Sequence, residues 1–246
     1  MNTTKTVLLT GASSGVGKSL AHHLYDLGYD LILLSRREPD IVKIGDRELV
    51  EFISTDLSKP DRATGIIDDI VNRYEYIPYV INNAGINTGG HLDRQKWDTI
   101  EHDLNINARM PWYVMKKVLP AMREENFGRI INITSGAPLN CYPGFGVYSA
   151  TKGMLNTMTV TLARENEGHN IKINLMSPGP VRSEMAPHAK LNPAICHPTL
   201  DYLMNLPESG DTGGFYWLGY KVPLFPDLEG VQWLEGIGNE KLKRIL

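Results

Sequence analysis

Short apolar runs alternate along this chain with longer stretches of helical periodicity. The runs lie at residues 6–10, 30–34, 50–54, 79–81, 128–133, 171–176 and 213–217. Short runs of aliphatic and β-branched residues predict buried strands, and the helical stretches that begin near residues 18, 58, 93 and 148 predict amphipathic helices. This alternation predicts an α/β fold: a single-domain doubly wound (Rossmann) parallel sheet of about seven strands with helices on both faces.

The last quarter of the chain departs from this alternation. Residues 184–210 are rich in proline, and a long loop beside a site is typical of a substrate lid. We interpret His188 and His197 within it as loop residues rather than metal ligands. Residues 221–246 form a variable C-terminal extension, in which we expect a short amphipathic helix. The prediction is one domain over residues 1–246, with a lid and an extension.

Composition excludes several classes of function. Of the 246 residues, 42% are apolar, and the net charge of -3 comes from interspersed signs. The apolar fraction suffices for a full hydrophobic core. A chain without a basic stripe is not expected to bind nucleic acid or a membrane surface. Cys141 and Cys196 lack the spacing of a metal site, so no metal is predicted. Without a signal-peptide core or an apolar run of bilayer length, we expect a cytoplasmic protein.

A glycine-rich segment follows the first predicted strand and opens a helix. Glycines let a backbone approach an anion, and the first helical turn offers free N–H groups and the positive end of the helix dipole. The spacing Gly11-x-x-x-Gly15-x-Gly17 indicates a dinucleotide loop. A relaxed P-loop over residues 12–19, typical of an NTPase, and a structural glycine turn are the alternatives. The P-loop needs an aspartate after a later strand, where this chain has Asn82.

The second predicted strand ends in Ser35, Arg36 and Arg37. In a dinucleotide fold, an acidic residue at this place accepts hydrogen bonds from the ribose hydroxyls of NAD, whereas guanidinium groups suit the 2′-phosphate of NADP. We therefore expect NADP(H) rather than NAD(H), with solvated strand-end arginines as the alternative. After the third strand, Asp56 contacts the adenine amine or caps the next helix, and both interpretations stay open.

Tyr148 and Lys152 stand four residues apart on a predicted helix, and so on one face. A free phenol, with a pKa near ~10, is a poor acid at neutral pH, and a neighbouring cation lowers that pKa. The pair is a candidate for proton transfer, with the hydroxyl of Ser135 holding the reacting oxygen. An isolated Y-x-x-x-K is more often a surface pair, so convergence with the other strand-end residues carries the prediction.

A long helical region from about residue 93 to 125 is interrupted near Asn107 and Pro111. Asn105 and Asn107 are unusual on a buried helix. Either an asparagine satisfies carbonyl groups freed by a kink at Pro111, or its side chain anchors a water near Lys152. The sequence alone leaves both interpretations open.

Together these motifs resemble the short-chain dehydrogenase/reductase family, in its branch with a T-G-x-x-x-G-x-G loop and a Y-x-x-x-K active site. The resemblance covers some three quarters of the chain and includes the thirteen-residue step from Ser135 to Tyr148. It implies that Tyr148 donates or accepts the substrate proton, that Lys152 binds the nicotinamide ribose and lowers the phenol's pKa, and that Ser135 positions the carbonyl oxygen. It also implies that Asn107, rather than Asn105, holds a relay water.

The motifs and the resemblance assign a cofactor groove and a substrate pocket at the carboxyl ends of the strands. The expected cofactor-binding residues are Thr10, Gly11, Ser13, Ser14, Gly15, Val16, Gly17, Ser35, Arg36, Arg37, Asp56, Leu57, Asn83, Ala84, Gly85, Tyr148, Lys152, Pro178, Gly179, Val181 and Ser183. The expected pocket residues are Ala137, Leu139, Cys141, Phe145, Pro180 and Met185. This lining is mostly apolar, so we expect a neutral, medium-sized ketone or aldehyde as the substrate.

The predicted function is NADP(H)-dependent interconversion of a carbonyl compound and an alcohol by hydride transfer, as a reductase because NADPH is favoured. A nucleotide-binding sensor without turnover is a second hypothesis, disfavoured because Ser135, Tyr148 and Lys152 are all present. The P-loop NTPase is a third. The resemblance also implies a homodimer or homotetramer that packs through helices around residues 107–122 and 151–162.

Overall fold

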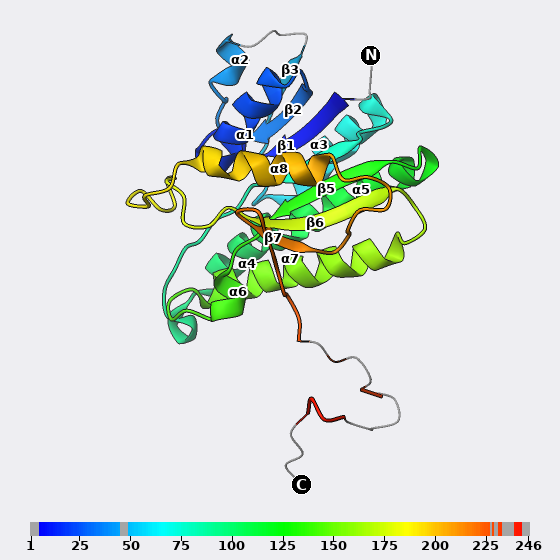
Figure 1. Ribbon diagram of the computed structural model, residues 1–246. Helices are drawn as coiled ribbons and strands as arrows, with labels where there is room; N and C mark the ends of the chain where they lie inside the picture. The colour runs from blue at the N-terminus through cyan, green and yellow to red at the C-terminus, as the bar shows by residue number, and fades with distance from the viewer. Residues whose placement is uncertain (1–4, 45–48, 227, 229–230, 233–238, 243–246) are drawn as a thin grey trace.

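The computed structural model describes residues 5–44, 49–226, 228, 231–232 and 239–242, and is built around one eight-stranded sheet in the order β3-β2-β1-β4-β5-β6-β7-β8 (Figure 1). The strands are β1 (Thr6–Thr10), β2 (Asp30–Ser35), β3 (Val50–Ser54), β4 (Tyr79–Asn82), β5 (Gly128–Ile133), β6 (Ile171–Ser177), β7 (Phe215–Trp217) and β8 (Tyr220–Val222). Every pairing from β3 to β7 is parallel, and only the β7–β8 pairing in the described sheet is antiparallel. The predicted doubly wound sheet is confirmed, with β8 as an addition.

The inner strands have the sequence of a sheet covered on both faces. β1, β5 and β6 are buried along their whole lengths, as continuous apolar runs in parallel sheets are. Polar side chains within them bond internally: Asn132 accepts from Asn82 at 2.8 Å and donates to the Thr159 hydroxyl at 2.8 Å. β8 lacks this pattern because it has only three residues, two of them exposed and the third partly buried. Its hairpin turns on Leu218 and Gly219, which both have positive φ.

Helices cover both faces of the sheet and enclose two apolar cores (Figure 1). The first face carries α1 (Gly15–Asp26), α2 (Ile41–Ile44) and α8 (His197–Met204). The second carries α3 (Pro60–Tyr74), α4 (Trp97–Leu104), α5 (Met110–Glu124) and α7 (Gly146–Glu165). Leu20 and Leu24 of α1 pack with Leu200 and Leu203 of α8 in the first core. This burial places α1 and α8 side by side.

The order of the strands fixes where a ligand binds. β1 lies between β2 and β4, so the chain runs outward in one direction up to β3 and in the other from β4 onward. In such open sheets, the crevice for ligands opens outside the carboxyl ends of the strands at this switch point. The glycine loop after β1 and the segment after β4 therefore face one crevice.

The predicted interruption of the long helix is confirmed, and it is a π-helical turn. Residues Asn105–Arg109 join α4 to α5 in this form. Pro111 lies in the first turn of α5, where a missing N–H is tolerated. A π-helical turn inserts a residue and rotates the side chains that follow, and such turns are frequent at functional sites. The turn brings Asn107 into the interior, where it is fully buried.

The predicted lid over residues 184–210 needs a correction. Its second half contains α8, which buries Leu200, Leu203 and Met204 in the core. The short 3₁₀ helix η4 (Pro193–Cys196) leads into it and buries Cys196. Because a lid must move without opening the core, only residues 184–192 keep that interpretation, as a proposal. Most of the amphipathic helix expected within residues 221–246 lies outside the described residues.

Among the residues that the structure describes, none of the helices combines the length and the apolar character needed to cross a membrane.

Candidate active site

The loop between β1 and α1 is packed too closely for side chains at its glycines. Gly11 and Gly15 have φ of +72° and +52°, which favours glycine. A Cβ atom added to Gly17 would lie 2.1 Å from the carbonyl oxygen of Gly11. Asn83 holds the loop from the other side, since its Nδ2 donates to the carbonyl oxygens of Thr10 at 3.0 Å and Gly11 at 3.1 Å. The bare backbone and the start of α1 together form an anion-binding cradle.

Thr10 fastens this cradle to the neighbouring segment. Its hydroxyl accepts hydrogen bonds from the backbone N–H groups of Asn83 and Ala84, both at 3.0 Å. The P-loop alternative loses support here, because Lys18 Nζ forms an ion pair with Asp40 at 2.6 Å rather than reaching toward the loop's anion position. Asn82, which stands where the P-loop alternative needs an aspartate, is buried and donates to Asn132 within the core.

The end of β2 brings a cation to the edge of the crevice. The Ser35 hydroxyl donates to the carbonyl oxygen of Arg37 at 2.6 Å and so shapes the turn that follows the strand. Arg37 Nη2 lies 2.7 and 2.8 Å from the two carboxylate oxygens of Glu184, a residue in the segment after β6. Arg36 lies close enough to Asp56 for its charge to lower the pKa of that carboxyl.

Asp56 follows β3 and closes a turn before α3. Its Oδ1 accepts from the backbone N–H of Ser58 at 3.0 Å and from the Ser58 hydroxyl at 2.8 Å. Burial raises the pKa of Asp56, but these hydrogen bonds and the nearby Arg36 and Lys59 outweigh it, and the net pKa is lowered. The helix itself begins at Pro60 with Lys59 as its N-cap. Asp56 is therefore a turn-former, and its contact with adenine stays a proposal.

Ser135 and Tyr148 come together as the sequence predicts. Ser135 follows β5, and its hydroxyl accepts from the backbone N–H of Ala137 at 3.1 Å. The phenol of Tyr148, in the first turn of α7, lies close enough to this hydroxyl for Ser135 to lower its pKa. Burial raises the pKa of Tyr148 by more than the Ser135 hydroxyl lowers it, so the net pKa is raised. The lowering of this pKa by Lys152, expected from the sequence, is not what the structure shows.

Lys152 points its ammonium group at the end of β5 instead. Its side chain is 3% exposed, and its Nζ donates to the carbonyl oxygen of Ile133 at 2.7 Å. Burial lowers the pKa of Lys152 to about 8. Burying a cation costs free energy unless the cation is hydrogen-bonded. A lysine at this buried position therefore suggests that its ammonium group has a functional role.

Asn107 lies beside Lys152 and fixes the segment after β4. Its Oδ1 accepts from the N–H of Ile86 at 2.8 Å, while its Nδ2 donates to the carbonyl oxygen of Ile86 at 2.8 Å and to the Thr151 hydroxyl at 3.0 Å. The kink interpretation is therefore wrong, because Asn107 bonds to another segment rather than to freed helix carbonyls. A Cβ atom on Gly85 would lie 3.3 Å from Lys152 Nζ and 3.4 Å from Asn107 Oδ1. Both polar atoms therefore lie close to the bare backbone of Gly85.

The segment after β6 folds back over the glycine loop. Gly179 has a φ of +70°, and a Cβ atom there would lie 2.8 Å from Trp217 Nε1. Val181 is buried and pairs with Leu191. Ser183 Cβ lies 3.0 Å from the position that a Cβ atom on Gly15 would take. The predicted cofactor residues on this segment thus border the cradle.

The expected substrate side is apolar and open. Ala137 is buried, whereas Leu139, Cys141, Phe145, Pro180 and Met185 are exposed. The ring of Phe145 stands 6.4 Å from that of Tyr148 at 72°. Two further residues, not predicted from the sequence, lie beside this lining: Leu92, whose Cβ atom lies 3.1 Å from the Cβ position of Gly146, and Tyr142, which packs edge-on against Phe145. Neither lies in a periodic run, so local pattern gives no signal for them.

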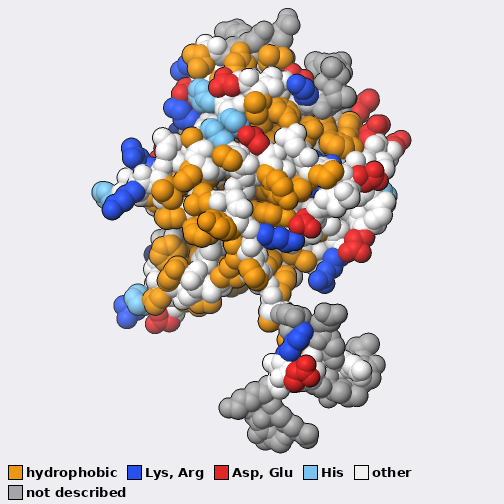
Figure 2. Space-filling view, viewed as in Figure 1, with side chains coloured by type: hydrophobic (Ala, Val, Ile, Leu, Met, Phe, Trp, Pro, Cys, Tyr) orange, Lys and Arg blue, Asp and Glu red, His pale blue; other side chains and the backbone are white. Residues whose placement is uncertain are grey.

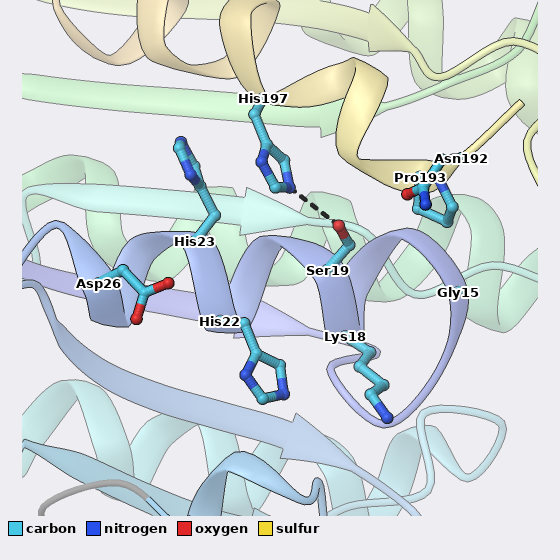
Figure 3. Close-up of a pocket in the computed structure, with 9 residues that line it drawn as sticks. All are labelled: Gly15, Lys18, Ser19, His22, His23, Asp26, Asn192, Pro193 and His197. Atoms are coloured by element: carbon cyan, nitrogen blue, oxygen red, sulfur yellow. Dashed lines mark hydrogen bonds between the residues drawn. The ribbon is translucent and has the colours of Figure 1, made fainter.

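A second polar cluster lies on the first face, in a hollow of about 470 Å³ between α1 and α8 (Figure 3). The Ser19 hydroxyl and His197 Nε2 are 2.9 Å apart, and His23 Nε2 lies 2.8 Å from Asp201 Oδ1. The rings of His23 and His197 stack with centroids 4.0 Å apart. The prediction that His197 is a loop residue is therefore wrong, since it starts α8 and packs against α1. Among the described residues, no group of three histidine, cysteine or acidic side chains is placed to hold a metal ion.

The fold and the site define the class: an oxidoreductase with a dinucleotide-binding sheet and a Ser–Tyr–Lys constellation at the carboxyl ends of its strands. The family model described as short chain dehydrogenase matches residues 5–193. The chain belongs to this family and is a dehydrogenase/reductase.

Individual relatives agree with this assignment. An uncharacterized oxidoreductase of Staphylococcus saprophyticus is 31% identical over 231 residues, which covers 86% of this chain and 94% of the relative. The crystal structure of a short-chain dehydrogenase from Streptomyces avermitilis superposes with a TM-score of 0.79 at 26% identity, covering 89% of both chains. The structure of ElxO with NADP bound gives a TM-score of 0.77 at 25% identity, covering 87% of this chain and 97% of that one.

Proposed function

We propose that this protein reduces a neutral ketone or aldehyde with NADPH, and that it catalyses the reverse oxidation with NADP+. The observation that carries the proposal is the proximity of the Ser135 hydroxyl to the Tyr148 phenol, with the buried Lys152 on the same helix four residues on, at the carboxyl ends of the strands. A phenol and a hydroxyl placed close together are suited to hold a carbonyl oxygen.

The residues present fit a dinucleotide. A Cβ atom on Gly11 or Gly17 would strike neighbouring protein atoms, so the loop keeps the bare backbone that a pyrophosphate can approach. Gly85, close to Lys152 Nζ and Asn107 Oδ1, would border the nicotinamide ribose. Arg36 and Arg37 at the end of β2 would contact the 2′-phosphate. The bound cofactor supplies the hydride that adds to the carbonyl carbon.

The protein's own groups handle the proton and the charge on oxygen. The Tyr148 phenol donates a hydrogen bond to the carbonyl oxygen and then its proton, while the Ser135 hydroxyl holds the same oxygen. Because burial raises the pKa of Tyr148, the phenol stays protonated at neutral pH and acts as an acid, which favours reduction. Lys152, whose ammonium group donates to the Ile133 carbonyl oxygen, would hold the nicotinamide ribose beside the phenol. Asn107 holds the neighbouring backbone so that a water can return the proton.

The preference for NADP(H) rests on Arg36 and Arg37, and it is supported by the NADP-bound relative. It is tested by kcat/KM for a panel of ketones and aldehydes with NADPH and with NADH. The proposal expects a preference for NADPH of at least about tenfold, the range of a lost charge-assisted contact. A preference for NADH would remove the basis for both the cofactor and the direction.

We also propose a homodimer or homotetramer in the cytoplasm. Apolar side chains gather over α8 and the β7 end of the sheet on the face that Figure 2 shows. Tyr202, Trp217 and Tyr220 are 53%, 41% and 68% exposed there, and patches of this kind mark association surfaces. Trp112 of α5 and Met154 of α7 are also partly exposed. Light scattering of the purified protein gives the oligomeric state, and a strictly monomeric mass would refute this part.

A further inference from the structure

The ion pair between Arg37 and Glu184 crosses the mouth of the proposed cofactor groove. The residues are 147 positions apart in the chain, and one guanidinium nitrogen contacts both carboxylate oxygens. Arg37 follows β2, at the place where a 2′-phosphate is recognised. Glu184 follows Ser183, which lies against the glycine loop. The pair therefore connects the edge of the adenosine site to the segment that covers the phosphate cradle.

Glu184 is held in this position by its own local structure. Ser183 and Ala186 exchange backbone hydrogen bonds at 3.3 and 3.1 Å, which makes residues 183–186 a tight turn. Arg182 N–H donates to the carbonyl oxygen of Leu191 at 2.8 Å and closes the base of the loop. A short closed loop presents its tip with little freedom, so the carboxylate stands opposite Arg37 without a large ordering cost.

We propose that Glu184 sets the cofactor affinity of this enzyme by occupying Arg37 in place of the 2′-phosphate. This inference rests on the proposed NADP(H)-dependent function. NADPH binds only as its 2′-phosphate displaces the Glu184 carboxylate from the guanidinium group. NADH has no group that competes for Arg37, so it leaves the ion pair and the turn at residues 183–186 in place.

Charge and geometry decide the direction of the exchange. A phosphate monoester carries a charge between about -1.5 and -2 at neutral pH and offers three acceptor oxygens, against a single charge on a carboxylate. The dinucleotide is also anchored by the glycine loop, which raises the effective concentration of the phosphate at Arg37. The 2′-phosphate therefore wins the guanidinium group, and the released Glu184 frees the turn that covers the cradle.

The expected size of the effect on NADPH binding follows from the solvent exposure of the Arg37–Glu184 ion pair. The Arg37 and Glu184 side chains are 62% and 66% exposed, and exposed ion pairs are weak because water screens them. Removing the competitor should therefore improve NADPH binding by about three- to fivefold, rather than by orders of magnitude. The opposite role is also physically possible: an acid at this edge could accept hydrogen bonds from the ribose hydroxyls of NADH.

Isothermal titration of NADPH and NADH against four proteins separates these roles. They are the wild type, Glu184→Gln, Arg37→Gln and the double variant. We expect Glu184→Gln to lower the Kd for NADPH about three- to fivefold and to leave the Kd for NADH within about twofold. In the Arg37→Gln background the same change should have no effect on NADPH binding, because the contested cation is gone. Glu124→Gln, an equal charge change at the end of α5, is the matched control and should leave both Kd values unchanged.

Three results would overturn the inference. An unchanged or higher Kd for NADPH in Glu184→Gln would show that Glu184 does not compete with the 2′-phosphate for Arg37. A higher Kd for NADH in that variant assigns Glu184 as a ribose acceptor. If Glu184→Gln improves NADPH binding equally with and without Arg37, the improvement comes from the change in net charge and not from competition for Arg37. If the wild type binds neither nucleotide, the proposed function fails and this inference fails with it, which distinguishes that case from the other three.

Discussion

Two clusters of serine and titratable side chains lie on different sides of the sheet, and only one of them has the properties of an active site. Ser135, Tyr148 and Lys152 gather at the carboxyl ends of β5 and its neighbours. Ser19, His197 and the His23–Asp201 pair gather between α1 and α8. Both contain a hydroxyl close to a group that can move a proton. Judged by residue type alone, both clusters are candidates for proton transfer.

The difference lies in what the polar atoms face. Beside Lys152, the bare backbone of Gly85 lies close to Lys152 Nζ and Asn107 Oδ1 at the carboxyl ends of the strands. In the α1–α8 cluster, the imidazoles stack on each other and bond to Ser19 and Asp201 within the cluster. The α1–α8 cluster borders a hollow of its own, so a hollow alone does not identify a reaction site. The first cluster is distinguished by its position beside bare backbone at the strand ends, whereas the second joins two helices.

The largest expected effect tests the first cluster through Lys152. Lys152→Met keeps the length of the side chain and removes the ammonium group, so the proposed contact with the nicotinamide ribose beside Tyr148 is lost. We expect kcat/KM to fall by roughly 10²–10⁴. In the wild type, the rate of reduction should decline as pH rises through about 8, where the buried ammonium loses its proton.

The same variant also has a stability signature. The pKa of Lys152 is about 8 in the folded protein against 10.5 for the unperturbed group. Between these pH values the unfolded chain binds more protons, so the free energy of unfolding of the wild type should rise with pH there. Denaturant titrations should show that Lys152→Met lacks this rise. An identical pH dependence in both proteins would mean that the ammonium group is not buried.

The next effect tests the bare backbone at the glycine loop. Gly17→Ala places a methyl group 2.1 Å from the carbonyl oxygen of Gly11, so the backbone must move. We expect a loss of about 1–3 kcal/mol in the free energy of unfolding, as for other overpacked sites, together with at least tenfold weaker nucleotide binding.

Gly65→Ala is the control for that prediction. Gly65 also lies within a helix, α3, and a Cβ atom there meets nothing within 4 Å among the described residues. This change should stabilise the protein by about 0.5–1 kcal/mol, because alanine favours the helix. Equal behaviour of the two variants in thermal unfolding would contradict the close packing of the loop.

The smallest effect tests the second cluster. Burial lowers the pKa of His197 below 6.5, and the charge of His23 lowers it further, while Asp201 and Ser19 act in the opposite direction. A lowered pKa means that the unfolded chain takes up the proton first, so the free energy of unfolding should fall as pH drops below 6.5.

His197→Gln should remove this dependence of the free energy of unfolding on acid pH. The difference from the wild type should be less than about 1 kcal/mol because the ring is only partly buried. Its kcat/KM at pH 7.5 should stay within about twofold of the wild type. His169→Gln, at an exposed position, is the control. A loss of turnover of a hundredfold in His197→Gln would show that the second cluster is catalytic and would break the comparison.

Much of the fold could be predicted because the inner strands are continuous apolar runs that are covered on both faces. The meeting of Ser135 and Tyr148 could also be predicted, since it follows from a strand end and a helix start at a fixed separation. β8 could not, because a three-residue strand has too few positions for a pattern. The burial of α8 was missed because proline-rich sequence around it resembles a loop, and its partners in α1 lie far away in the chain.

The other differences between prediction and structure concern contacts that leave no pattern in the local sequence. Arg37 meets Glu184 across 147 positions, and Ser19 meets His197 across 178. The pKa of Tyr148 was predicted with the wrong sign because spacing alone shows a neighbouring lysine but not the burial of the phenol. Burial depends on what packs around a residue, which only the folded chain specifies.

The central claim is that the Tyr148 phenol gives its proton to a substrate oxygen that Ser135 also holds. The most direct test is Tyr148→Phe, assayed with NADPH and the carbonyl compound that the wild type reduces fastest, alongside the Kd for NADPH. The account predicts that kcat falls by roughly 10²–10⁴ while the Kd stays within about threefold. Turnover equal to that of the wild type would contradict it.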